Sequence, residues 1–192
     1  MQRLNPESTK DPNIFIQGLV DQATETMFLS SISHPHIITL RAISAGTEGE
    51  DGSMFNSNFF FIIDRLIDTL DVRIRKWKSQ SKSAKGMVSK LTRRSSSRLE
   101  DLQETKLSYA YDLMGAIEYL HKNHIVFRNL KPENVGFNIR NDIVLFGFGL
   151  AREVHEDDRV SDATWKLTGE TGTLRYMAPE VVLNKPYGKY MR

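Results

Sequence analysis

The sequence predicts an α+β protein in which helices and short strands occupy separate stretches of the chain. Residues 14–33 and 107–123 place apolar side chains three and four positions apart, which is the spacing of one helix face. Residues 37–44 and 59–64 are rich in isoleucine and phenylalanine, which favour strands. At 192 residues, the chain is long enough for one domain with a sizeable core.

The composition is that of an ordinary soluble globular protein, with 40% hydrophobic and 26% charged residues. The net charge of +2 favours no class of partner. Because there are no cysteines, disulfides and thiolate metal sites are excluded. No apolar run approaches the roughly 20 residues that span a bilayer, and the first six residues are too polar for a signal peptide. We therefore expect a cytoplasmic or nuclear protein without a membrane partner.

The first predicted helix, within residues 14–33, carries an apolar stripe that we expect to face inward. It should end before His34-Pro35, because a residue that precedes proline is disfavoured in the helical conformation. The stripe consists of Ile16, Leu19, Val20, Ala23 and Met27.

The two predicted strands flank a loop, residues 45–58, rich in Gly, Ser and Asn. Because residues 59–63 are apolar at every position, we expect both faces of the second strand to be buried. The helix over 107–123 should then lead into the apolar pair Ile125-Val126. Its inward stripe is expected to be Leu107, Ala110, Tyr111, Met114, Ile117 and His121.

Between Arg73 and Arg98 every charged residue is basic, and serines are scattered throughout. This composition predicts a solvated, disordered insertion over about residues 79–104. The run Arg93 to Ser97 looks like a substrate site for a basophilic kinase, where added phosphate would reduce the positive charge. Nucleic-acid binding by the basic stretch is an unlikely alternative, because few aromatics are interleaved for base stacking.

Three motifs occur in order in the last third of the chain. Residues 128–134 read Arg-Asn-Leu-Lys-Pro-Glu-Asn, residues 147–149 read Gly-Phe-Gly, and residues 178–180 read Ala-Pro-Glu. Their order and spacing resemble the catalytic and activation segments of a eukaryotic protein kinase, which carry His-Arg-Asp-x-Lys-x-x-Asn, Asp-Phe-Gly and Ala-Pro-Glu. The resemblance covers nearly the whole chain except the insertion.

This resemblance implies a bilobal, protein kinase-like α+β fold that is incomplete. Residues 1–66 would form a partial small lobe and residues 67–192 a partial large lobe. No Gly-x-Gly-x-x-Gly occurs, so the phosphate-covering loop is expected to be absent. The chain is also expected to stop before the long helix around which the family builds its large lobe.

The resemblance also assigns roles around the first two motifs. Asn129 takes the place of the catalytic base, and Gly147 takes the place of the magnesium-binding aspartate. Lys131 would contact the γ-phosphate, Asn134 would bind one magnesium ion, and Arg128 would clamp a phosphorylated activation loop. Asparagine is not a base and glycine has no side chain, so both carboxylates that the reaction needs are missing. We expect a pseudokinase.

Five further positions would face the nucleotide in the family. Glu25 stands where a helix glutamate pairs with a strand lysine, and Gln2 stands where that lysine belongs. Asp64 and Leu66 belong to the linker beside adenine, and Gly136 replaces a bulky apolar residue below it. The family's cofactors are ATP and Mg²⁺, and these substitutions predict that the chain binds both poorly.

The activation segment carries residues of the Ser/Thr class. Thr173 matches the threonine that supports Ser/Thr-type substrate binding, although the tyrosine-kinase-like group is also possible. Glu180 is expected to be structural, and the expected partners are proteins. The candidate phosphoacceptors are Ser161, Thr164, Thr168 and Thr171.

Two other interpretations stay open. An active Ser/Thr kinase would need a substitute carboxylate from Asp142 or from the pair Asp157-Asp158. Alternatively, the basic stretch is the active part and binds nucleic acid or acidic partners. Phe127, which replaces the family's histidine, is expected to stack on Phe148 and Leu29 and so preserve the fold without catalysis.

Overall fold

The computed structural model describes residues 11–44, 60–84, 93–162 and 164–188. Helices and short strands both occur, as predicted. The elements are α1 (Pro12–Ser31), β1 (Leu40–Ile43), β2 (Phe61–Ile63), β3 (Leu66–Thr69), α2 (Leu70–Ala84), α3 (Arg93–Lys122), β4 (Ile125–Val126), β5 (Val135–Asn138), β6 (Ile143–Leu145), β7 (Arg152–Glu153), β8 (Arg159–Ser161), β9 (Thr164–Trp165) and α4 (Pro179–Val182).

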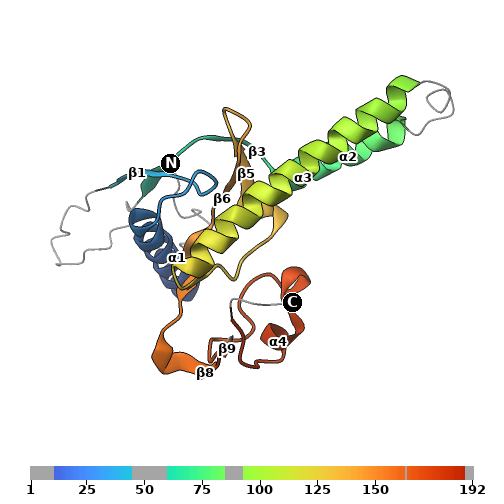
Figure 1. Cartoon of the computed structure of the whole chain (residues 1–192). Coiled ribbons are helices and arrows are strands. Elements are labelled where there is room, and N and C mark those ends of the chain that lie inside the picture. The colour runs from blue at the N-terminus through green and yellow to red at the C-terminus, as the bar shows by residue number, and fades with distance from the viewer. Residues whose placement is uncertain (1–10, 45–59, 85–92, 163, 189–192) are drawn as a thin grey trace.

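The strands form small antiparallel sheets. The largest has the order β3-β5-β6, in which Gly136 pairs with Thr69 on one side and with Val144 on the other. The remaining sheets pair β1 with β2, β4 with β7, and β8 with β9. Figure 1 shows α1 at one end of α3, with the segment of β8, β9 and α4 below them.

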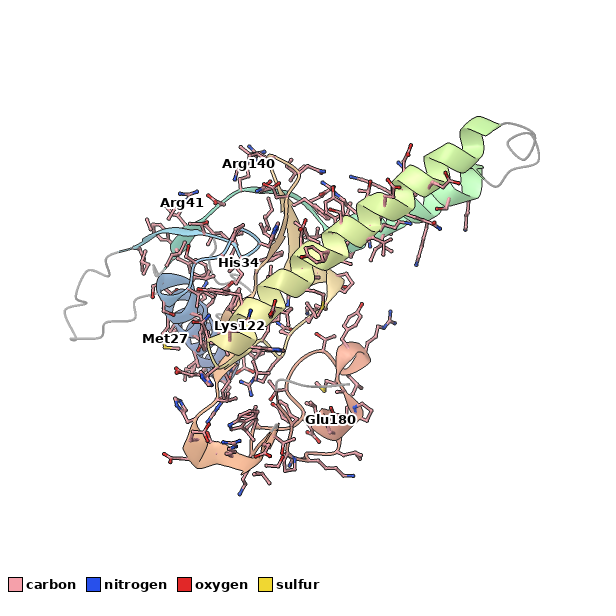
Figure 2. The ribbon with its side chains drawn as sticks, in the orientation of Figure 1. Met27, His34, Arg41, Lys122, Arg140 and Glu180 are labelled. Carbon is pink, nitrogen blue, oxygen red and sulfur yellow. The ribbon has the colours of Figure 1, made fainter. Side chains whose placement is uncertain are left out.

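Helix α1 confirms the first predicted helix but not its predicted inward face. The Asp11 side chain caps its start by accepting a hydrogen bond from the Asn13 backbone N–H at 2.9 Å. Ile16, Val20 and Met27 are each more than half exposed, and Met27 lies on the outer side of the helix (Figure 2). The buried residues are Gln22, Glu25, Thr26, Phe28 and Leu29.

The inward face of α1 is set by its close contact with the 3-10 helix Phe148–Leu150, called η4. A Cβ added to Gly149 would lie only 3.0 Å from the Asp21 Cβ and 3.1 Å from the Asp21 carbonyl oxygen. The helix therefore turns its polar-rich face towards η4, which leaves three residues of the predicted stripe exposed and the other two, Leu19 and Ala23, half-buried.

The two predicted strands are shorter than expected. Regular pairing in the first begins only at Leu40, although Ile37 bridges in parallel to Leu145. In the second, Phe61 is fully buried but Ile62 is exposed, so the expectation of two buried faces is wrong for Ile62. The reason is that β1 and β2 form a two-stranded sheet with one face on the core. Phe59 lies outside the described residues.

The predicted disordered insertion is wrong for the part that the structure describes. Helix α2 continues to Ala84 and α3 begins at Arg93, and the two form a hairpin that extends away from the rest of the molecule (Figure 1). Lysine, arginine, glutamine and alanine are good helix formers, so the basic composition allows a helix as readily as a solvated coil. Stacking of Trp77 on Tyr109, with 6.3 Å between ring centroids, holds the base of the hairpin.

Helix α3 contains the predicted helix, but only the end of the predicted stripe faces inward: Ile117 packs against the core and His121 is half-buried, while the other four residues are exposed. Leu107, Tyr111 and Met114 are each more than 60% exposed. Ala116 and Leu120 are fully buried instead, since they face the sheet that contains β6. Both faces of this helix carry apolar residues, so spacing alone does not identify the buried one.

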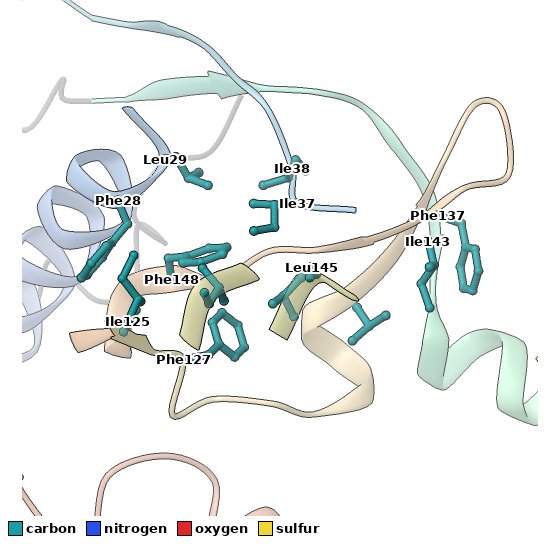
Figure 3. Close-up of a cluster of buried hydrophobic side chains, with 14 residues drawn as sticks. Phe28, Leu29, Ile37, Ile38, Ile125, Phe127, Phe137, Ile143, Leu145 and Phe148 are labelled. Atoms are coloured by element: carbon teal, nitrogen blue, oxygen red, sulfur yellow. The ribbon is translucent and has the colours of Figure 1, made fainter. Parts of the chain in front are cut away.

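The buried side chains form two clusters. The larger lies between α1, α3 and the β5–β6 hairpin (Figure 3) and includes Phe28, Leu120, Phe127, Phe137 and Phe148. The smaller cluster lies under β9 and α4. Strand β4 joins them, because Ile125 belongs to the larger cluster and Val126 to the smaller. The smaller cluster consists of Val126, Val154, Trp165, Leu167, Val181 and Tyr187.

Among the described residues, no helix is long and apolar enough to cross a membrane.

Candidate functional site

The β5–β6 hairpin brings Asn134 next to Gly147. Residues Pro132–Asn134 form a 3-10 helix that leads into β5, and Val135 pairs with Leu145 across the hairpin. The Phe146 backbone N–H donates to the Asn134 carbonyl at 3.0 Å. Two residues that the sequence assigned to one metal site are therefore neighbours.

The Asn134 side chain fills the space beside Gly147. Its Nδ2 donates to the Asn129 carbonyl oxygen at 2.8 Å, which fixes the amide against the preceding loop. A Cβ added to Gly147 would lie 3.0 Å from both Cγ and Oδ1 of Asn134. Gly147 also has a φ of 84°, in the left-handed region that favours glycine. A side chain at position 147 would therefore meet both backbone strain and a steric contact.

The Glu25 carboxylate reaches the same turn from α1. One of its oxygens accepts a hydrogen bond from the Gly147 backbone N–H at 2.9 Å. Burial raises the pKa of Glu25, and hydrogen bonds from the backbone N–H groups of Gly147 and Phe148 offset this only in part. Gln2, the predicted neighbour of Glu25, lies outside the described residues. Glu25 therefore ties α1 to the Gly147 turn.

Apolar stacking behind this turn agrees with the expectation for Phe127. Its ring meets the Phe148 ring edge to face, with 4.9 Å between centroids, and both rings are buried in the larger cluster with Leu29 (Figure 3). The packing that orders the two segments is thus independent of the missing carboxylates.

The residues assigned to the adenine site contact other parts of the protein. A Cβ added to Gly136 would lie 2.6 Å from the Leu66 Cδ1, so the Leu66 side chain occupies the space in which a larger residue at 136 would sit. The Asp64 carboxylate is turned to Arg41, with Nε–Oδ1 and Nη2–Oδ2 distances of 2.6 and 2.9 Å. Hydrogen bonding to Arg41 lowers the pKa of Asp64.

Lys131 and Arg128 connect the catalytic-loop motif to the activation segment. The Lys131 Nζ donates to the Thr173 Oγ1 at 3.0 Å. The Arg128 Nε donates to the Leu150 carbonyl at 2.7 Å, and its Nη1 donates to the Thr168 Oγ1 at 2.9 Å. Of the candidate phosphoacceptors, Thr168 is thus the one whose hydroxyl contacts Arg128.

The backbone at this junction is tightly constrained. Arg128 has a φ of 62°, which is uncommon for a residue other than glycine. Gly172 has a φ of 116°, and a Cβ there would lie 2.6 Å from the Arg128 carbonyl oxygen. Only glycine fits position 172 in this arrangement.

The other predicted activation-segment residues make local contacts. The Thr171 hydroxyl donates to the carbonyls of Thr168 and Gly169. The hydroxyls of Ser161 and Thr164 bond to each other at 2.6 Å. Glu180 lies in the first turn of α4, with no cation of the described residues within ion-pair distance.

The proposed substitute carboxylates are not placed at the Gly147 turn. Asp142 lies at the closed end of the β5–β6 hairpin, where it accepts from the Asn138 Nδ2 at 3.0 Å, while Gly147 follows the open end. Asp158 faces Arg152 at 3.7 Å. Within the described part of the chain, no three His, Cys, Asp or Glu side chains are grouped to hold a metal ion.

Sequence reasoning missed two features near the site. Tyr187 is buried, and its hydroxyl donates to the Thr168 carbonyl at 2.6 Å, although no motif in the sequence points to it. A cavity of about 210 Å³ lies between the end of α3, the 127–130 loop and α4. Its lining includes Ile117, Leu130, Tyr176 and Met177.

Comparison with known proteins agrees with the motifs and their geometry. Residues 17–191 match the family described as the protein kinase domain. The chain belongs to the protein kinase family. The α+β elements described above are accordingly a partial kinase fold.

Several relatives of this kinase-family chain are Ser/Thr kinases. The cAMP-dependent protein kinase catalytic subunit PRKX of Homo sapiens is 41% identical over 85 residues, which are 44% of this chain and 21% of that protein. The serine/threonine-protein kinase sgk-1 of Caenorhabditis elegans is 37% identical over 81 residues, which are 42% of this chain and 16% of that protein. The aligned part of the chain thus spans about a fifth or less of these two relatives.

Proposed function

We propose that this chain is a catalytically impaired, Ser/Thr-type member of the kinase family that acts by binding or scaffolding other proteins. The observation that carries the proposal is the Gly147 turn. Mg²⁺ prefers oxygen ligands, carboxylates above all. Of the two residues assigned to the metal, Asn134 supplies one amide oxygen and Gly147 has no side chain, while the Glu25 carboxylate at this turn accepts the Gly147 N–H. These residues do not fit the metal.

The residue at the catalytic-base position, Asn129, also supports impaired catalysis. Asn129 cannot take the proton of a substrate hydroxyl, and loss of a general base typically costs about 10²–10⁴-fold in rate. Phosphoryl transfer relies mainly on positioning and on neutralising the developing charge. The family's carboxylates at positions 129 and 147 contribute independently to positioning the reacting groups and to neutralising the developing charge. This chain has lost both carboxylates.

The packing over Gly136 adds a third argument, which concerns the nucleotide. A site for a flat aromatic base needs an open apolar slot. The Leu66 side chain lies against Gly136, within 2.6 Å of a Cβ placed there. A base could enter this position only if Leu66 moved. We therefore propose that ATP binding is weak as well.

The alternative is a Ser/Thr protein kinase of weak or atypical activity. The family match and the kinases among the relatives support it equally well. Its specific support is the Lys131–Thr173 hydrogen bond, which keeps a cation beside the activation segment. Glu25 is also turned towards the Gly147 segment.

The deciding experiment measures thermal unfolding of the chain with millimolar ATP, with and without Mg²⁺. A ligand that binds the native state raises the unfolding midpoint by mass action, so we expect no appreciable shift in either case. A magnesium-dependent rise would support the alternative and contradict the proposal.

Phosphate transfer provides the second measurement. We expect no transfer of the γ-phosphate to a general protein substrate by the natural chain. The double variant Asn129→Asp, Gly147→Asp restores both carboxylates, and Lys131→Ala in the same background is its control. Measurable transfer by the natural chain would contradict the proposal. No gain in transfer by a double variant that is shown to be folded would mean that the two carboxylates are not the cause of the impairment.

A further inference from the structure

The segment between α1 and β1 contacts α3 through His34 and Tyr119. The His36 backbone N–H donates to the His34 Nδ1 at 3.1 Å. The Ser33 backbone N–H donates to the Tyr119 hydroxyl at 3.1 Å, and the rings of His34 and Tyr119 are 5.1 Å apart. Figure 2 shows His34 where this segment passes beside α3. We call residues 33–36 the latch.

The second histidine fixes the latch to the sheet. The His36 Nδ1 lies 2.9 Å from the Ile143 carbonyl oxygen in β6. A carbonyl only accepts hydrogen bonds, so this contact requires a proton on the His36 Nδ1. The His36 Nε2 lies 3.6 Å from the Asp112 Oδ1 in α3. Asp112 thus faces His36.

The latch requires that the His34 Nδ1 carry no proton, because it accepts the His36 backbone N–H. Imidazolium has donors at both nitrogens and cannot make this bond. The titratable groups that the structure places against His34 are His36, with ring centroids 5.7 Å apart, and Tyr119. Neither is a carboxylate that could pair with a protonated His34.

We propose that the latch holds the end of α1 in place in a pH-dependent way. Its hydrogen bonds form while His34 is neutral and break when His34 gains a proton. Helix α1 ends at Ser31, directly before the latch, and carries the Glu25 carboxylate that accepts the Gly147 N–H. Release of the latch therefore loosens the contact between α1 and the Gly147 turn.

The direction of the pH effect follows from the environment of His34. Burial, and to a lesser degree the neighbouring His36, lower the pKa of His34 below its ordinary 6.5. The unfolded chain then binds more protons than the folded chain at mildly acid pH. The stabilisation by His34 is complete above pH 6.5 and is lost as the pH falls towards the lowered pKa.

The test compares thermal unfolding between pH 7.5 and 5.0 for the natural chain and His34→Asn. The asparagine Oδ1 can accept the His36 N–H but does not titrate in this range. We expect the fall in midpoint with pH to be smaller in His34→Asn. His155→Asn is the control, because His155 is exposed and lies outside the latch. It should keep the natural slope.

Ring nitrogen shifts of His34 in the natural chain provide a readout that does not depend on any variant. We expect a neutral ring protonated on Nε2 at pH 7.5. After His34 titrates, the protection factor of the Gly147 amide, taken against its intrinsic exchange rate at each pH, should fall. Equal slopes for the natural chain and His34→Asn would overturn the proposal. A proton on the His34 Nδ1 at pH 7.5 would also overturn it.

Discussion

At the scale of single residues, neighbouring side chains occupy the space beside the two glycines of the site. Leu66 covers Gly136, and Asn134 lies beside Gly147. A glycine that had left an open slot would accept a larger side chain easily. Here the neighbouring side chains already occupy the space, so restoring the family's residue at either position requires a second movement.

We therefore expect Gly136→Leu to destabilise the protein by about 1–3 kcal/mol, the usual cost of overpacking a well-filled core. Urea unfolding measures the change. The double variant with Leu66→Ala should recover part of the loss, because the two positions compete for one volume. Gly115→Ala is the matched control. Nothing lies within 4 Å of a Cβ there, and α3 should gain about 0.5–1 kcal/mol. Equal effects at 136 and 115 would contradict the packing described here.

At the scale of elements, both long helices expose most of the apolar stripe that their spacing selected. We expect Leu120→Ala to cost about 2–5 kcal/mol, because Leu120 is fully buried in the larger cluster. Leu107→Ala should stay within about 0.5 kcal/mol, since Leu107 is 69% exposed. Chemical unfolding of both variants distinguishes the two faces. A larger loss for Leu107→Ala would restore the face predicted by spacing.

The α2–α3 hairpin gives a second prediction at this scale. Gln80 lies inside α2, where proline would remove a backbone hydrogen bond and clash with the preceding turn. We expect Gln80→Pro to lower helical circular dichroism and to expose the hairpin to trypsin, while Gln80→Ala changes neither. If the segment were the solvated insertion predicted from its composition, both variants would behave like the natural chain.

At the scale of the whole molecule, the two clusters of buried side chains meet at β4 and at the Arg128 guanidinium. The Tyr187 hydroxyl lies 3.5 Å from the Arg128 Nη1 and donates to the Thr168 carbonyl. Tyr187 therefore links the smaller cluster to the loop that carries Asn129. This contact holds the activation segment against the loop through the protein's own side chains.

We expect Tyr187→Phe to cost about 0.5–1.5 kcal/mol, because the hydrogen bond from the buried Tyr187 hydroxyl to the Thr168 carbonyl is lost. Hydrogen exchange measures where the loss falls. Amides in residues 164–188 should exchange faster, while those in α1 keep the natural rate. Uniformly faster exchange in both regions would mean that the two clusters unfold as one unit.

The sequence by itself determined the family, the order of the motifs and the existence of α1 and α3. Motif residues such as Asn134, Gly147 and Glu180 are recognised by identity and spacing, which do not depend on distant contacts. The adjacency of Asn134 and Gly147 was implied by the resemblance, which assigned both to magnesium, whereas the β5–β6 hairpin that brings them together comes from the structure.

Only the tertiary structure decided which helix faces are buried, how the basic stretch folds and what fills the glycine positions. An apolar stripe such as Leu107, Tyr111 and Met114 is buried only if another element covers it, and in the described residues the sheet packs on the opposite side of α3. The contact of Leu66 with Gly136 likewise depends on the register of β3 against β5. Such choices are made by partners distant in the chain, and local spacing carries no information about them.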